Sequence, residues 1–308
     1  QPSKQGWLYV LDRETGEPIW PIEERAVEAS DVPGELLGLT QPFPTRPPAY
    51  DRQGVSVDDL IDFTPVLRAE ALELVAKFRL GPIFTPPVVA DPNGRYGTLM
   101  LPSTGGGTNW PGGSLDPETG IAYLYSSTSV TSLGLLHDPE QSDMNFIRGT
   151  PPEIDAVEAA LNIEGIPIIK PPWGRITAID LNQGEILWQV PNGHGPRDHP
   201  AIRHLGLDRL GSPGRPSPLA TGTLLFIGEG SDLVGGPRVP EGMPLEISTN
   251  YGEPWFRAYD KETGDVVWEM ELPAGTTGAP MTYMHEGRQY IVVAVNGRDV
   301  PAQFLAFS

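Results

Sequence analysis

Residues 255–268 read Trp255-Phe-Arg-Ala-Tyr-Asp260-Lys-Glu-Thr-Gly264-Asp-Val-Val-Trp268. An Asp is followed after four residues by Gly and after eight by Trp, and two other segments repeat this pattern. They read Trp7-Leu-Tyr-Val-Leu-Asp12-Arg-Glu-Thr-Gly16-Glu-Pro-Ile-Trp20 and Trp173-Gly-Arg-Ile-Thr-Ala-Ile-Asp180-Leu-Asn-Gln-Gly184-Glu-Ile-Leu-Trp188. A degenerate fourth copy reads Gly113-Ser-Leu-Asp116-Pro-Glu-Thr-Gly120-Ile-Ala-Tyr-Leu124. Self-similarity of this kind indicates a repeat architecture.

Each copy predicts two strands joined by a tight turn, because apolar alternation ends at the Asp and the Gly can adopt a positive φ. A single hairpin is at best marginally stable, so repeated hairpins have to pack on one another. We interpret Trp20, Trp188 and Trp268 as structural plugs between neighbouring units. Further strands are expected at 223–228, 289–295 and 98–101, and four strands per unit are typical of a propeller blade.

Composition agrees with an all-β protein of one domain over residues 1–308. The chain has 36 Gly and 35 Pro, which favour turns, and its 39% hydrophobic content argues against disorder. The formal net charge of −19 disfavours nucleic acid as a partner. The absence of Cys excludes disulfides and Cys-ligated zinc from this chain, and no apolar run is long enough to span a membrane.

Three insertions are predicted, at about 26–97, 132–170 and 229–254, and in repeat proteins such insertions map to loops. The first contains an expected helix, with Thr64 as N-cap and Pro65 at its first position, extending to Gly81. A second short helix is expected within residues 153–161. The chain starts abruptly at Gln1, directly before an expected strand over 7–11, so we expect further sequence to precede it.

The repeat resembles the tryptophan-docking motif of the pyrroloquinoline-quinone (PQQ) dependent dehydrogenases. The segments Lys4-Gln-Gly-Trp-Leu-Tyr-Val-Leu-Asp12, Gly106-Gly-Thr-Asn109-Trp110 and Leu272-Pro-Ala-Gly-Thr-Thr-Gly-Ala-Pro-Met-Thr-Tyr283 extend the likeness over essentially the whole chain. The order of segments is similar to that of membrane-type quinoprotein glucose dehydrogenases. The resemblance implies a β-propeller, eight-bladed in that family, of which this chain holds about four to five blades as a C-terminal part, with short helical insertions.

The resemblance also implies a cofactor site. Lys4 matches the lysine that contacts the quinone oxygens of PQQ, where a fixed cation stabilises negative charge on oxygen. Asn109 matches an asparagine at the same edge of PQQ, and Trp110 follows it as in the family. From its position alone, Lys4 is better read as a solvated lysine before a strand, and the flanking motif reverses this; the alternative for Asn109-Trp110 is a Gly-rich turn with a core Trp.

Other parts of the family's site have no match in this chain. The resemblance places the general-base Asp and the ligands of the divalent cation, Ca²⁺ or Mg²⁺, upstream of Lys4, so no catalytic residue and no metal ligand is assigned here. The segment Gly214-Arg-Pro-Ser-Pro-Leu-Ala-Thr-Gly222 lacks the Trp of the alcohol-oxidising branch, which favours a sugar or polyol substrate. Arg215 in that segment could face the substrate, but we interpret it as a surface residue.

The histidines at 194, 199 and 204 recur every five residues, which suits neither one helix face nor alternate strand positions. We therefore predict a solvated loop there, not a metal site.

The resulting hypothesis is a periplasmic PQQ-dependent dehydrogenase that oxidises a sugar, polyol or alcohol and passes electrons to ubiquinone or a cytochrome. As this fragment alone the chain is expected to be inactive, and any membrane attachment would lie in the missing N-terminal part. The alternative is a cofactor-free propeller that serves as a periplasmic protein-binding scaffold, for which Lys4, Asn109 and Trp110 need not share a pocket.

Overall fold

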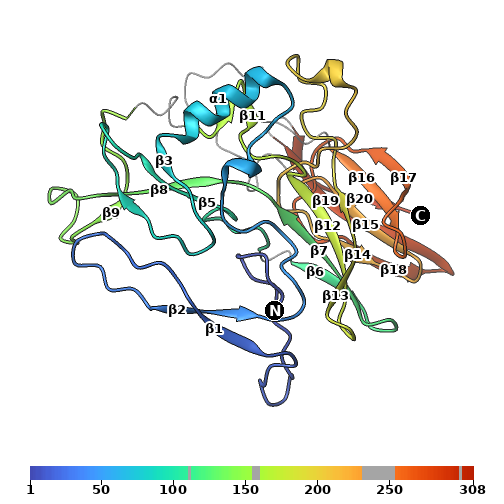
Figure 1. The fold of residues 1–308 in the computed structure, drawn as a ribbon. Coiled ribbons are helices and arrows are strands. Elements are labelled where there is room, and N and C mark those ends of the chain that lie inside the picture. The colour runs from blue at the N-terminus through green and yellow to red at the C-terminus, as the bar shows by residue number, and fades with distance from the viewer. Residues whose placement is uncertain (110–111, 155–159, 231–253, 298–299) are drawn as a thin grey trace.

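The computed structural model describes residues 1–109, 112–154, 160–230, 254–297 and 300–308. Within these ranges the chain is built of short strands and one α-helix, and the sheets are arranged side by side (Figure 1). No helix in the described ranges is long and apolar enough to cross a membrane.

Two four-stranded antiparallel sheets contain three of the four repeat copies, those at 113–124, 173–188 and 255–268, and four strands per sheet are typical of a propeller blade. The first contains β6 (Gly113–Asp116), β7 (Ile121–Ser127), β12 (Gly174–Asp180) and β13 (Glu185–Pro191). The second contains β14 (Leu219–Ala220), β15 (Leu224–Gly228), β16 (Trp255–Asp260) and β17 (Val266–Glu271). A third sheet, of three strands, contains β18 (Met281–His285), β19 (Arg288–Gly297) and β20 (Val300–Phe307). The β-propeller class and the strands expected near 98–101, 223–228 and 289–295 are confirmed.

The repeated tryptophans join neighbouring units, as predicted. A Cβ placed on Gly264 would lie 2.9 Å from the ring of Trp188, and one on Gly184 would lie 2.9 Å from the ring of Trp20. Trp20 and Trp188 each pack over the Gly of the next full repeat. That position has no room for a side chain. The indole of Trp188 also donates a 3.0 Å hydrogen bond to the carbonyl of Lys261. Trp268 is 41% exposed, and it packs against Phe256 of its own sheet and Phe307 of the three-stranded sheet.

The first repeat forms its turn but no regular strand. Gly16 donates to the carbonyl of Asp12 at 2.8 Å, whereas residues 7–11 take part only in isolated bridges, of Leu8 to Pro2 and of Leu11 to Pro18. Both partners are prolines, which have no N–H to extend a ladder. The expectation of a strand over 7–11 is therefore wrong.

Most of the remaining elements lie between residues 22 and 100 or between residues 131 and 167. The paired strands are β1 (Ile22–Ala26) with β2 (Thr40–Pro44), and β10 (Asn162–Ile163) with β11 (Ile166–Pro167). A five-stranded sheet contains β3 (Phe78–Arg79), β5 (Gly97–Met100), β8 (Thr131–Leu136) and β4 (Val88–Val89), with β9 (Ile147–Arg148) paired to β8. The helical elements are α1 (Pro65–Val75) and the 3₁₀ turns η1 (Val57–Asp59) and η2 (Arg203–Leu205).

Helix α1 begins as predicted, since the Thr64 hydroxyl accepts a hydrogen bond from the N–H of Leu67. It ends at Val75, earlier than the expected Gly81, because Phe78 pairs with Gly97 as the start of β3. The second expected helix, within 153–161, and the third insertion, 229–254, lie largely outside the described residues.

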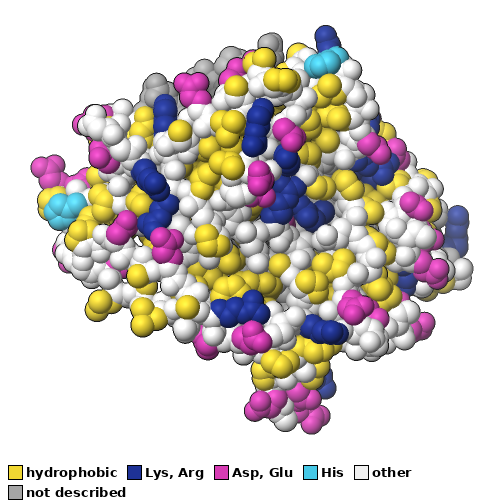
Figure 2. Space-filling view, in the orientation of Figure 1, with side chains coloured by type: hydrophobic (Ala, Val, Ile, Leu, Met, Phe, Trp, Pro, Cys, Tyr) yellow, Lys and Arg dark blue, Asp and Glu magenta, His cyan; other side chains and the backbone are white. Residues whose placement is uncertain are grey.

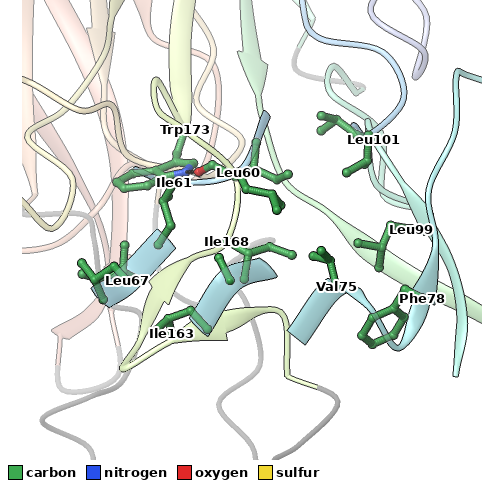
Figure 3. Packing of buried hydrophobic residues seen from close by; sticks show 14 of the residues in the cluster. Leu60, Ile61, Leu67, Val75, Phe78, Leu99, Leu101, Ile163, Ile168 and Trp173 are labelled. Atoms are coloured by element: carbon green, nitrogen blue, oxygen red, sulfur yellow. Dashed lines mark hydrogen bonds between the residues drawn. The ribbon is translucent and has the colours of Figure 1, made fainter. Parts of the chain in front are cut away.

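The largest apolar cluster lies under α1 and binds the inserted elements to the blade that contains β12 (Figure 3). Trp173, directly before β12, is 1% exposed, and its indole donates a 2.6 Å hydrogen bond to the carbonyl of Ile169. A second cluster, which includes Tyr123, Ile176 and Ile227, lies between the two four-stranded sheets. The segments that contain α1, β10 and β11 are therefore packed against the sheet that contains β12.

Candidate functional site

Lys4 lies exposed on a tight turn. Gly6 closes this turn with φ +79° and donates to the carbonyl of Ser3 at 3.1 Å. A later segment anchors the turn, because Tyr50 donates its N–H to the Gly6 carbonyl at 2.9 Å and the Gln53 amide donates to the Gln5 carbonyl at 2.8 Å. Hydrogen bonds from Tyr50 and Gln53 therefore fix the backbone on either side of Lys4.

The glycine loop before Asn109 packs directly on this lysine. Gly106 has φ +86°, and a Cβ placed on it would lie 2.5 Å from Cγ and 3.0 Å from Cα of Lys4. Gly107 donates its N–H to the Lys4 carbonyl at 2.9 Å, and its own carbonyl accepts from the N–H of Ser127 at 2.7 Å. Only a residue without a side chain fits at 106 while Lys4 keeps its place.

Asn109 belongs to the same loop. It is half-buried, and its side-chain amide donates a 3.0 Å hydrogen bond to the carbonyl of Gly105. The structure therefore brings two of the three predicted residues, Lys4 and Asn109, to the Gly105–Gly106 step. Trp110 lies outside the described residues.

Arg215 approaches this step from a third part of the chain. A Cβ on Gly105 would lie 3.2 Å from a terminal guanidinium nitrogen of Arg215. The residue is exposed, in agreement with the surface interpretation, yet it is a second cation beside the loop that holds Lys4. No local sequence pattern links Arg215 to Lys4, because the two residues are more than two hundred positions apart.

A pocket of about 220 Å³ opens beside Lys4. Its lining includes Lys4, Gln5, Phe84, Leu99 and Ser103, but not Asn109. Ligand pockets usually measure about 300 Å³ or more, so this one would hold only part of a cofactor-sized ligand. Phe84 has φ +69°, a strained conformation for an aromatic residue, which often marks a functional site and which no local sequence pattern predicts.

A group of buried charges lies beneath the two loops. Asp51 is fully buried and lies 3.5 Å from the guanidinium of Arg175. Burial, together with the nearby charge of Arg175, lowers the pKa of Arg52. On the molecular face seen in Figure 2, acidic side chains are scattered around the rim and a group of Lys and Arg side chains lies nearer the middle.

The histidines at 194, 199 and 204 lie in the irregular segment around η2. His194 packs against the ring of Trp255, and the ring of His199 accepts a hydrogen bond from the N–H of Ala201. The described parts of the chain contain no group of three or more His, Asp or Glu residues able to hold a metal ion. The loop interpretation of this segment agrees with the irregular backbone that surrounds η2.

The charges around this loop suit an anionic ligand. Lys4 and Arg215 supply positive charge, Asn109 supplies a polar amide nearby, and the glycines at 105 and 106 leave a surface without side chains for close approach.

Comparison with known proteins identifies one family. Residues 1–291 match the family model described as PQQ: glucose/ethanol/alcohol dehydrogenase, beta-propeller domain. The chain is 32% identical to the glycerol dehydrogenase large subunit of Gluconobacter thailandicus, covering 96% of this chain and 40% of that protein. It is 29% identical to the quinoprotein glucose dehydrogenase of Escherichia coli, covering 96% of this chain and 36% of that protein.

Among solved structures, the quinohemoprotein alcohol dehydrogenase of Comamonas testosteroni aligns with a TM-score of 0.50 at 18% identity. The match covers 100% of this chain and 35% of that one, and it supports the fold alone. The chain thus spans less than half the length of each of these relatives.

Proposed function

Because this chain belongs to the glucose/ethanol/alcohol dehydrogenase β-propeller family, we propose that it supplies part of the PQQ site of a dehydrogenase acting on a sugar, polyol or alcohol. One observation carries the proposal: Lys4 is packed on Gly106, in the loop where Asn109 binds the Gly105 carbonyl. Two segments about a hundred residues apart in sequence, each matched to the cofactor edge by resemblance, thus meet in space.

The residues present fit PQQ, which is flat and anionic. When bound, PQQ supplies the two-electron acceptor for the carbon that bears the substrate hydroxyl. The Lys4 ammonium would hold a quinone oxygen and stabilise negative charge there. Asn109 would fix the orientation of the same edge. The glycine loop fixes the positions of Lys4 and Asn109 relative to each other, because the N–H of Gly107 donates a hydrogen bond to the Lys4 carbonyl.

The other parts of the activity belong to the same proposal. The aspartate that accepts the substrate hydroxyl proton and the ligands of a divalent cation, Ca²⁺ or Mg²⁺, would come from segments that precede Lys4. Electrons would pass to ubiquinone or a cytochrome, in the periplasm. In this proposal the 308-residue chain is inactive by itself, because it would lack the base.

The test uses the complete protein, loaded with PQQ and Ca²⁺ or Mg²⁺ and assayed by dye reduction with sugars, polyols and alcohols. Lys4→Ala should abolish turnover and weaken PQQ binding, whereas Lys4→Arg should keep part of both because it keeps the charge. The matched control is Lys77→Ala, since Lys77 lies over the ring of Tyr96 at 5.3 Å, at the start of the five-stranded sheet.

Full turnover in Lys4→Ala would show that the role given to this lysine is wrong. Failure of the wild-type complete protein to bind PQQ at all would instead favour the cofactor-free scaffold.

A further inference from the structure

The buried carboxylate of Asp51 lies between the two loops of the candidate site. A Cβ on Gly6, two residues after Lys4, would lie 3.1 Å from Cβ of Asp51. A Cβ on Gly107, two residues before Asn109, would lie 3.3 Å from its Oδ2 atom. The Asp51 side chain is 0% exposed. One acidic side chain therefore contacts both the turn that carries Lys4 and the loop that carries Asn109.

The same carboxylate is bound to the central strands of a blade. Its Oδ1 atom accepts a 2.7 Å hydrogen bond from the hydroxyl of Thr128, the residue after β7. Arg175, in β12, lies 3.5 Å from Oδ1 and donates to the Thr128 hydroxyl at 3.0 Å. Oδ1 also accepts a 2.7 Å hydrogen bond from the backbone N–H of Arg52. Asp51 thus connects the rigid part of the sheet to the two loops above it.

This arrangement is not what stability alone would favour. A buried ion pair carries a desolvation cost that an apolar pair of similar volume avoids. Within the described residues, Oδ2 of Asp51 and Nε of Arg175 have no hydrogen-bond partner, although both are buried. Buried polar atoms left unsatisfied are uncommon and call for an explanation other than folding. Here the unsatisfied oxygen faces the glycine loop.

We propose that Asp51, held by Thr128 and Arg175, is a positioning residue that sets the Lys4 turn against the Gly105–Gly107 loop. This inference rests on the proposed PQQ site but assigns to Asp51 no contact with PQQ or substrate. Asp51 acts through Gly6 and Gly107, so its loss displaces Lys4 and Asn109 relative to each other. A shift of this kind on the order of 1 Å lowers turnover by about 100-fold.

The test compares Asp51→Asn with Asp116→Asn in the complete protein. Asp116 is a carboxylate of similar burial at the end of β6, and its side chain is paired at 2.7 Å with Lys261, which follows β16. The direct readout is the PQQ dissociation constant, measured by titration of the apoprotein at a temperature where both variants are folded. Asp51→Asn should weaken PQQ binding by about 10-fold or more and lower kcat, whereas Asp116→Asn should stay within about two-fold of wild type.

A second readout does not depend on PQQ. Hydrogen exchange of the peptide that covers Gly106 and Gly107 should be faster in Asp51→Asn, because the Gly107 N–H is bonded to the Lys4 carbonyl, and unchanged in Asp116→Asn. If Asp51→Asn fails to fold, Thr128→Val removes the bridging hydroxyl alone and should show the same effects at smaller size.

The outcomes separate the two proposals. Unchanged exchange of the glycine loop in Asp51→Asn overturns the positioning role, even in a protein that binds PQQ. Faster exchange in a protein that never binds PQQ supports the positioning role and removes the proposed function. Equal loss of PQQ affinity in Asp51→Asn and Asp116→Asn, at equal thermal stability, assigns the effect to general destabilisation and also overturns the inference.

Discussion

Replacing Gly106 by alanine tests the contact on which the candidate site depends. At φ +86° a residue with a Cβ costs about 1–2 kcal/mol of folding free energy from backbone strain alone. In addition, the new methyl would lie 2.5 Å from Cγ, 2.7 Å from Cβ and 3.0 Å from Cα of Lys4. Carbon atoms pack at about 3.5–4.0 Å, so the two segments must separate by about 1 Å. Because Cα is among the atoms met, a new side-chain rotamer of Lys4 does not relieve the contact.

The control is Gly16→Ala. Gly16 has φ +78°, close to that of Gly106, but a Cβ there meets no atom within 4 Å. Both variants should therefore lose about 1–2 kcal/mol in urea unfolding from the backbone term, and Gly106→Ala a further 1–3 kcal/mol or so from overpacking. Only Gly106→Ala should lose function, by about 100-fold in kcat/KM for a 1 Å displacement of a positioned group.

The assay is dye-reduction turnover and PQQ titration of the complete protein, with urea unfolding of the same preparations. If Gly106→Ala keeps turnover and PQQ affinity within about two-fold of Gly16→Ala, then Lys4 is either not packed on Gly106 or not used at the site, and the reasoning is refuted.

Two further predictions concern the joints between blades. The hydrogen bond from Lys261 lowers the pKa of Asp116 to about 2, against about 3.9 in an unfolded chain. Between these two pKa values the unfolded state binds more protons than the folded state. The pair therefore stabilises the fold above about pH 4, and this stabilisation is lost as the pH falls towards 2. The stability difference between wild type and Asp116→Asn should shrink over that interval in urea titrations, and a constant difference would contradict the assignment. Gly264→Ala should lose more stability than Gly287→Ala, by about 1–3 kcal/mol, because both positions have φ near +76° to +79° but only the first meets Trp188. Equal unfolding midpoints would show that the docking contact does not resist a methyl group.

The strands of the blades can be predicted from the sequence because the pattern that specifies them is local and repeated. Asp and Gly four residues apart define the turn, and the Trp at a fixed offset identifies the joint, so β12, β13, β16 and β17 follow directly. The first repeat failed as a strand because Pro2 and Pro18 are its partners, and strand pairing depends on what lies opposite. The end of α1 at Val75 likewise depends on tertiary pairing, since the residues that follow form β3 and pair with β5.

The candidate site was only half predictable. Lys4 and Asn109 could be found because a family pattern surrounds each of them. Asp51 could not, because it lies in a Pro-rich irregular segment and its partners Thr128 and Arg175 are far away in the sequence. Nothing local indicates that its side chain is buried beneath two loops.

The contact between each docking tryptophan and the next glycine also bears on how such proteins can change over time. Each joint is made by a Trp and a Gly at fixed positions of adjoining repeats, whereas segment 132–170 is held to the rest of the chain by a separate apolar cluster that includes Ile168 and Trp173. Recombination that moves a repeat together with the segment packed on it would keep both kinds of contact. A cut between Leu60 and Ile169 would keep the Trp–Gly joints but would divide that cluster, so the exchangeable unit is larger than one blade.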